Sequence, residues 1–141
     1  YLAYSQQSFW QVWDSDNSRP FRESNYAPEA YLTFPSPNPL DFVRIKRWRF
    51  GVIHESNGQM TEKSRSWNRI YGQTLLGISP FSIDLKLWWR IPESNKTHSS
   101  NQSGDDNPDI LDFMGYGELK VAYQWGENLW SLNLRNNFKN Y

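Results

Sequence analysis

Two residues that could act together in acyl transfer lie two positions apart, His54 and Ser56, in the string HESNG (54–58). On an extended strand such residues leave the same face, so the imidazole could take the proton of the serine hydroxyl. A second string, SRSWNR (64–69), brings Asn68, whose amide could accept the other ring N–H of the histidine and fix its tautomer. The predicted reaction is acyl-ester hydrolysis, although a lone His-x-Ser pair also occurs by chance.

The elements that must position these residues are strands. Residues 83–91 alternate between apolar and mostly charged positions, and residues 117–125 do the same, whereas a helical period is almost absent. The sequence therefore predicts an all-β chain. The expected strands are about 2–13, 28–34, 41–54, 65–78, 83–91, 110–125 and 129–138.

The expected connections alternate in length. The long polar ones are 14–27, 55–64 and 92–109, and the short turns are 35–40, 79–82 and 126–128. This alternation, with polar residues on the second strand face, is typical of a transmembrane antiparallel barrel wall. Tryptophans towards the segment ends fit the two membrane–water interfaces. The tryptophans concerned are Trp10, Trp13, Trp48, Trp67, Trp89, Trp125 and Trp130. A soluble sandwich or lipocalin-like barrel is the alternative, because such proteins also alternate and carry interior aromatics.

Composition excludes several classes of protein. The 15 basic residues are balanced by 15 acidic ones, which argues against a nucleic-acid partner. There is no cysteine, so neither a disulfide framework nor a thiolate metal site is expected. No apolar stretch approaches the length of a membrane helix, and position 1 lacks the layout of a signal peptide.

The alternation of side chains along a strand places all three polar residues of the expected site on the lipid side. His54 shares its face with Trp48, Phe50 and Val52, and Asn68 shares its face with Ile70, Leu76 and Ile78. Polar groups facing hydrocarbon are costly, and catalysis on lipid explains them. The same count puts Arg44 and Lys46 on the lipid side, where they snorkel unless a bulge reverses the parity.

Four strings carry a resemblance to a known family: HESNG, SRSWNR, the earlier SRPFRESNY and the later DDNPDILDFMGY. In order and spacing they resemble outer membrane phospholipase A of Gram-negative bacteria, across essentially all 141 residues. The resemblance implies a twelve-stranded antiparallel barrel. Residues 1–141 would then be an internal fragment of about seven strands, a partial phospholipase domain without its N-terminal and C-terminal strands.

The resemblance also implies the chemistry. The family's catalytic serine, histidine and asparagine fall on Ser56, His54 and Asn68, the three residues that parity puts on one face. The implied activity is hydrolysis of acyl esters of phospholipids and lysophospholipids, of the A1 and A2 types, at the outer leaflet of the bacterial outer membrane. The alternative is an inactive barrel, a pore or binding scaffold, in which the triad is inherited but unused.

Calcium is the implied cofactor. By resemblance its ligands fall on Ser64, the backbone carbonyl of Gln59, and Ser18 from a neighbouring subunit, and oxygen ligands suit this hard cation. The backbone N–H of Gly58 would add a donor for the substrate oxyanion. The metal loop departs from the family pattern, which often has an acidic residue shortly before the position of Ser64, because Thr61 stands there with Glu62 beside it.

Gln6 is the residue expected at a subunit interface. It shares parity with Leu2 and Tyr4, so its amide would face lipid and seek a partner. Pairing with the same residue of a second copy would satisfy it, and the family forms a calcium-linked homodimer. A register shift that turns Gln6 to the inner face is the alternative.

Overall fold

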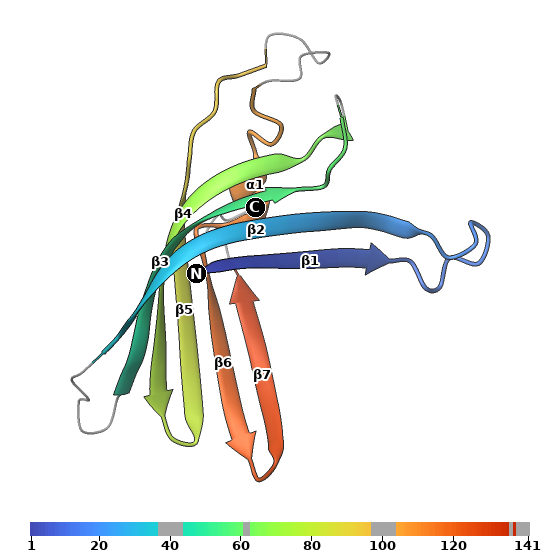
Figure 1. Cartoon of the computed structure of the whole chain (residues 1–141). Coiled ribbons are helices and arrows are strands. Elements are labelled where there is room, and N and C mark those ends of the chain that lie inside the picture. Colours follow the sequence, from blue (N-terminus) through green and yellow to red (C-terminus); the bar gives the residue numbers. More distant parts are fainter. Residues whose placement is uncertain (37–43, 61–62, 97–103, 136, 138–141) are drawn as a thin grey trace.

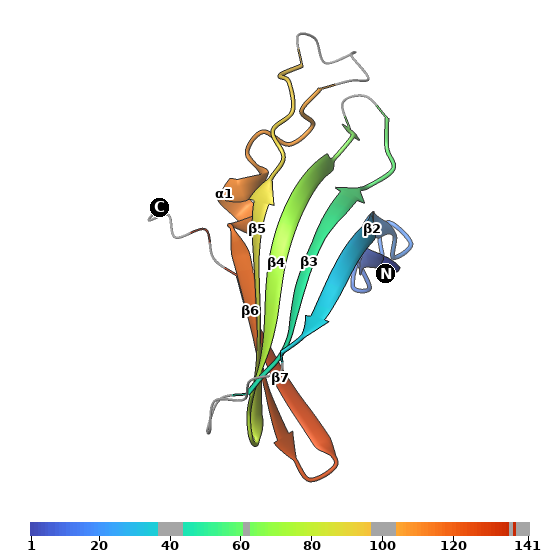
Figure 2. The same cartoon turned by 60° about the vertical axis from the view of Figure 1, so that its left-hand side comes forward.

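The chain forms one antiparallel sheet of seven strands in which every strand pairs with its neighbours in sequence. The computed structural model describes residues 1–36, 44–60, 63–96, 104–135 and 137. The all-β prediction is confirmed, and the sheet is strongly curved (Figures 1 and 2). The elements are β1 (Leu2–Trp10), β2 (Phe21–Pro35), β3 (Arg44–Ser56), β4 (Ser66–Ile78), β5 (Phe81–Arg90), α1 (Ile110–Met114), β6 (Gly117–Trp125) and β7 (Asn128–Arg135).

Two predicted boundaries on the N-terminal side are wrong. The first strand ends at Trp10 rather than at position 13, and the second begins at Phe21 rather than at position 28. Residues 21–27 are mainly polar and were expected in a loop. They pair with β1, and polar side chains are acceptable there because one face of this sheet is itself polar.

The predicted strand over 110–125 is correct only from Gly117 onwards. Its first part is the short helix α1, because Ile110, Leu111 and Met114 lie on one side of a helical turn and pack against the buried cluster of the sheet. Gly115 follows the helix with a φ of 66°, a conformation that suits glycine. Apolar residues in this stretch therefore satisfy helical spacing rather than strand alternation.

Long and short connections alternate as predicted, with shifted bounds. The turns after β4 and β6 contain only residues 79–80 and 126–127, whereas residues 11–20, 57–65 and 91–116 form long connections. The connections after β3 and β5 lie at the same end of the sheet (Figure 2). The predicted turn at 35–40 falls mostly outside the described residues. In the described part of the chain, no helix has the length and apolarity to cross a membrane.

The two faces of the sheet differ in character. The inner face holds a buried cluster, and the outer face exposes a broad apolar surface. The cluster consists of Ile53, Trp67, Tyr71 and Trp88. The exposed apolar residues of β3 and β4 on the other face are Trp48, Phe50, Val52 and Ile70. This arrangement fits a wall whose outer side meets hydrocarbon.

Trp67 is an exception to the predicted aromatic belt. Its side chain is 2% exposed on the inner face, where its ring meets Trp88 edge to face with centroids 6.4 Å apart. The guanidinium of Arg69 lies over the Trp67 ring, 3.9 Å from its centroid, and also pairs with Glu55. Strand parity turns this tryptophan inward, so its position near a strand end does not bring it to a membrane interface.

A bulge in β3 decides where the two basic residues near its start lie. Arg44 pairs with Gly77 whereas Arg47 pairs with Leu75, so Lys46 is an extra residue in the strand. Arg44 is thereby turned to the face of Gly77, which is the inner face. The Lys46 side chain passes over the same glycine, with Cε 2.6 Å from where a Cβ would stand. Of the two alternatives for these residues, snorkelling or a bulge that reverses the parity, the structure has the bulge.

Candidate active site

The three residues expected to catalyse hydrolysis lie together at the long-connection end of β3 and β4. His54 is the partner of Asn68 across the two strands, and Ser56 is the partner of Ser66. Val52, the next residue on the same face, is exposed with 49% of its surface accessible. Antiparallel partners point to the same side, so the prediction that the three side chains share the outer face is confirmed.

A hydrogen bond joins the histidine to the asparagine. His54 Nδ1 lies 2.8 Å from Asn68 Oδ1, and Asn68 Nδ2 donates to Glu93 Oε1 at 2.9 Å. Since the amide nitrogen faces a carboxylate, the amide oxygen faces the ring, and Nδ1 carries the proton. In the neutral imidazole this tautomer leaves Nε2 without a proton, so Nε2 can act as a base.

Ser56 is held by the turn that follows it. The N–H of Gly58, which has a φ of 68°, donates to Ser56 Oγ at 3.1 Å. The Asn57 side chain fixes this turn, because Nδ2 donates to the carbonyl of Lys63 at 2.8 Å and Oδ1 accepts the N–H of Arg65 at 2.9 Å. Ser56 Oγ thus accepts one hydrogen bond and keeps its own proton available.

The structure does not bring the serine and histidine into direct contact. Within the described residues, His54 bonds to Asn68 and Ser56 bonds to Gly58, with no hydrogen bond between His54 and Ser56. The geometry therefore shows the histidine and asparagine aligned, and the serine two residues away on the same face. Gly58 N–H, expected to donate to a substrate oxyanion, is directed at the serine oxygen.

The residues expected to bind calcium are divided between two loops. Gln59 and Ser64 belong to the β3–β4 connection, whereas Ser18 lies in the β1–β2 connection with a φ of 61° (Figure 1). Residues 61–62 lie outside the described part of the chain. Ser18 thus belongs to a different connection from Gln59 and Ser64, and its role as a ligand from a neighbouring subunit stays a prediction.

Sequence reasoning missed Asp106, which the structure places beside Ser64. Its Oδ2 accepts hydrogen bonds from the hydroxyls of Ser64 and, at 2.9 Å, Ser66, and Oδ1 pairs with the ammonium of Lys96. Desolvation raises the pKa of Asp106, but the bonds from Lys96, Ser64 and Ser66 outweigh it and hold the pKa below its usual range. The only signal in the sequence was its place in the string DDNPDI.

The oxygen atoms of Ser64 and Asp106 suit a hard cation. A hydroxyl and a carboxylate oxygen meet at Ser64 and Asp106, and oxygen donors are what calcium prefers. Among the described residues no group of three His, Cys, Asp or Glu side chains is placed to hold a metal. Within the described residues, hydroxyl and carbonyl oxygens would have to complete a calcium site at this point.

Strand pairing places Gln6 on the outer face, and its expected place at a subunit interface stays a prediction. It pairs with Tyr26, which pairs in turn with Ser56, so the three share one side of the sheet. The irregularity in β1 comes later, between Phe9 and Trp10, and does not reverse the parity of Gln6. Its Nε2 donates to Ser8 Oγ at 3.2 Å.

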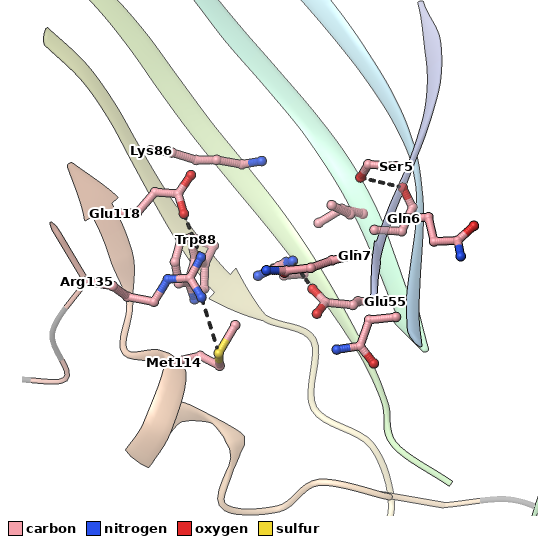
Figure 3. A pocket seen from close by; sticks show the side chains of 13 residues that line it. Ser5, Gln6, Gln7, Glu55, Lys86, Trp88, Met114, Glu118 and Arg135 are labelled. Carbon is pink, nitrogen blue, oxygen red and sulfur yellow. Dashed lines mark hydrogen bonds and ion pairs between the residues drawn. The ribbon is translucent and has the colours of Figure 1, made fainter. Parts of the chain in front are cut away.

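The hollow in Figure 3 lies on the opposite face of the sheet from the candidate site. Its lining mixes charged and polar side chains with apolar ones, and it contains an ion pair between Arg135 and Glu118 at 2.7 Å. The labelled residues include Gln7, Glu55, Lys86, Trp88, Glu118 and Arg135. His54, Ser56 and Asn68 point away from this hollow, so it is not where a substrate would meet them.

Known proteins resemble this chain over its whole length. A family profile described as phospholipase A1 matches residues 1–141. The phospholipase A1 of Klebsiella pneumoniae is 37% identical over 129 residues, which is 92% of this chain and 42% of that protein. The phospholipase A1 of Escherichia coli K12 is 34% identical over 125 residues, 89% of this chain and 40% of that protein.

Solved structures agree with the sequence relatives. Outer membrane phospholipase A from Escherichia coli superposes with a TM-score of 0.81 at 33% identity, covering 97% of this chain and 49% of the other. A Salmonella typhi outer membrane phospholipase dimer with bound calcium gives a TM-score of 0.81 at 35% identity, covering 97% of this chain and 50% of the other. The chain thus spans about half of each solved relative.

Proposed function

Because the chain belongs to the phospholipase A1 family, we propose that it forms part of an outer-membrane enzyme that hydrolyses the acyl esters of phospholipids. The observation that carries this proposal is the contact of 2.8 Å between His54 Nδ1 and Asn68 Oδ1, beside Ser56 on an apolar outer face. A serine, a base and an orienting group placed where lipid would lie support catalysis on lipid.

In the proposed reaction Ser56 Oγ attacks the ester carbonyl while His54 Nε2 takes the hydroxyl proton. Asn68 holds the ring in the required orientation without adding charge. As the oxygen of Ser56 becomes bonded to the acyl carbon, its bond from Gly58 N–H weakens, and that N–H becomes available to the developing oxyanion. Protonated His54 then donates to the departing glycerol oxygen, which leaves the acyl group on Ser56. Water, deprotonated by His54, attacks the acyl carbon, and the fatty acid leaves as His54 returns the proton to Ser56 Oγ. We extend the proposal to both acyl positions and to lysophospholipids.

Calcium in this scheme would be held by Ser64, by the carbonyl of Gln59 and by Ser18 of a second subunit. Asp106 is a fourth candidate, because its carboxylate already lies against the Ser64 hydroxyl. The cation would supply positive charge where the carbonyl oxygen becomes negative. The Salmonella relative, solved as a dimer with bound calcium, supports calcium as the cation, and the ligand residues are our proposal.

The same relative supports a homodimer, and we propose that the face carrying Gln6 forms the interface. Gln6, Tyr26 and Ser56 share that face, so a second copy docked there would lie next to the nucleophile. The two subunits would then enclose acyl chains between them. We further propose that residues 1–141 supply seven consecutive strands of one larger barrel, since β1 and β7 are the edges of the sheet.

The test is release of fatty acid from phospholipid micelles by a full-length protein that contains this chain, with calcium and with a chelator. Ser56→Ala should lower the rate at least about a thousandfold, because it removes the attacking oxygen. Release that persists in Ser56→Ala would contradict the assignment of the nucleophile. Absence of release by the unmodified protein with calcium would favour a pore or binding scaffold with an unused triad.

A further inference from the structure

A carboxylate outside the expected triad bonds to its asparagine. Glu93 lies three residues beyond the end of β5, and its Oε1 accepts from Asn68 Nδ2 at 2.9 Å in a partly buried contact. The backbone fixes this approach, because the N–H of Ile91 donates to the carbonyl of Asn68 at 2.8 Å and extends the pairing of β4 with β5. Glu93 therefore continues the outer-face row of β5 up to the candidate site.

The bond matters because the two ends of an amide are chemically different. An ionised carboxylate only accepts hydrogen bonds, so it holds the NH₂ end of Asn68 and turns the oxygen towards His54. A flipped amide would present its NH₂ group to Nδ1 and favour the tautomer that carries the proton on Nε2. That tautomer cannot take the proton of Ser56.

We propose that Glu93 is a positioning residue for the hydrolytic reaction, acting through Asn68 to hold His54 in its reactive tautomer. The inference rests on the triad proposed above. The Glu93 carboxylate also places a negative charge one hydrogen bond beyond the neutral Asn68 side chain. This charge favours the imidazolium that forms when His54 takes the proton. The residue that supplies the charge, Glu93, belongs to the connection after β5.

The arrangement also explains why an amide, rather than a carboxylate, occupies position 68. An aspartate there would place a carboxylate oxygen about as near to Glu93 as Asn68 Nδ2 is now, at 2.9 Å. Two ionised carboxylates at that separation repel, and one of them would be driven to bind a proton. Glu93 and Asn68 thus form a matched pair, so each should change the effect of substituting the other.

The experiment is a double-substitution cycle in a full-length protein that contains this chain. The variants are Glu93→Gln, Asn68→Asp and the two combined, with kcat and KM measured on phospholipid micelles at saturating calcium. Glu127→Gln is the control, because it removes the same charge from the exposed turn between β6 and β7. Glu93→Gln should lower kcat about tenfold with little change in KM, whereas the control should not.

The direction in which Glu93→Gln changes kcat in the Asn68→Asp background decides whether Glu93 acts through Asn68. In the Asn68→Asp background, Glu93→Gln should raise kcat, because it removes the repulsion, and a gain in activity cannot come from misfolding. The proposal is overturned if Glu93→Gln behaves like Glu127→Gln, or if it lowers kcat in both backgrounds. Hydrolysis that survives in Ser56→Ala would instead overturn the proposed triad, so the two failures are distinguishable.

Discussion

At the residue scale, Asp106 makes more contacts than its place in a polar connection suggests. It accepts bonds from the hydroxyls of Ser64 and Ser66 and pairs with Lys96, although both serines are 40 or more positions away in sequence. A carboxylate at this point brings negative charge to the loop proposed to hold calcium. Its neighbour Asp105 has a different role, pairing with Arg90 and accepting the N–H of Asn107 at 2.8 Å.

We predict that Asp106→Asn raises the calcium concentration for half-maximal hydrolysis about 10–100-fold, the usual cost of altering a group next to a metal ligand. Asp109→Asn is the control, since it removes the same charge from an exposed position of the same connection. The measurement is a calcium titration of fatty-acid release by the full-length variants. Equal half-maximal concentrations for the two variants would count against a role for Asp106 at the metal.

Parity was enough to predict the shared face of His54, Ser56 and Asn68, because the period of a strand is fixed over short distances. The same count, continued past Ile91, reaches Glu93, so this residue could have been found from the sequence. Asp106 could not, because its contact with Ser64 depends on how two long connections fold against each other. No local pattern encodes that approach.

At the scale of elements, the strands were predicted well where one face is apolar and poorly where both are polar. β5 and β7 were placed to within two or three residues, whereas the start of β2 was missed by seven. At the start of β2, polar side chains lie on both faces, with Glu23 and Asn25 on the inner face and Ser24 on the outer face with Tyr26, so alternation does not distinguish this strand from a loop. The helix α1 was missed because five residues are too short for a periodic signal.

Gly51 of β3 shows how closely the inner face is packed. A Cβ at this position would stand 2.7 Å from the carbonyl oxygen of Ala30 and 2.8 Å from Tyr71 Cε1. We predict that Gly51→Ala destabilises the folded barrel by about 1–3 kcal/mol, because backbone and a buried ring cannot both move away.

The measurement is the urea midpoint for unfolding of the full-length protein in vesicles, compared with Gly72→Ala. At Gly72, on the outer face, a Cβ would meet Phe50 at 3.4 Å, close to an ordinary contact. Similar midpoints for the two variants would mean that the space around Gly51 adjusts more readily than the structure indicates.

At the scale of the whole molecule, the two glutamines of β1 offer a direct test of the proposed dimer. By strand pairing Gln6 lies on the outer face with Tyr26, whereas Gln7 lies on the inner face with Asn25. Gln6→Ala should weaken self-association by about 0.6–2 kcal/mol, the range for polar contacts between membrane segments. Gln7→Ala is the control on the same strand.

Sedimentation in detergent with saturating calcium would measure both dissociation constants. A loss of association with Gln7→Ala and none with Gln6→Ala would show that a different face forms the interface. Equal association for the two variants and the unmodified protein would remove Gln6 from the interface altogether.

The outward position of His54, Ser56 and Asn68 has a consequence for how substrate would arrive. An enzyme with its nucleophile in a cleft meets molecules that diffuse through water in three dimensions. Here Ser56 shares its face with exposed Val52, so the reacting groups would border directly on the hydrocarbon of the surrounding leaflet. Phospholipids would then reach the serine by sliding sideways within a two-dimensional fluid, and the released fatty acid would leave by the same route without crossing any channel in the protein.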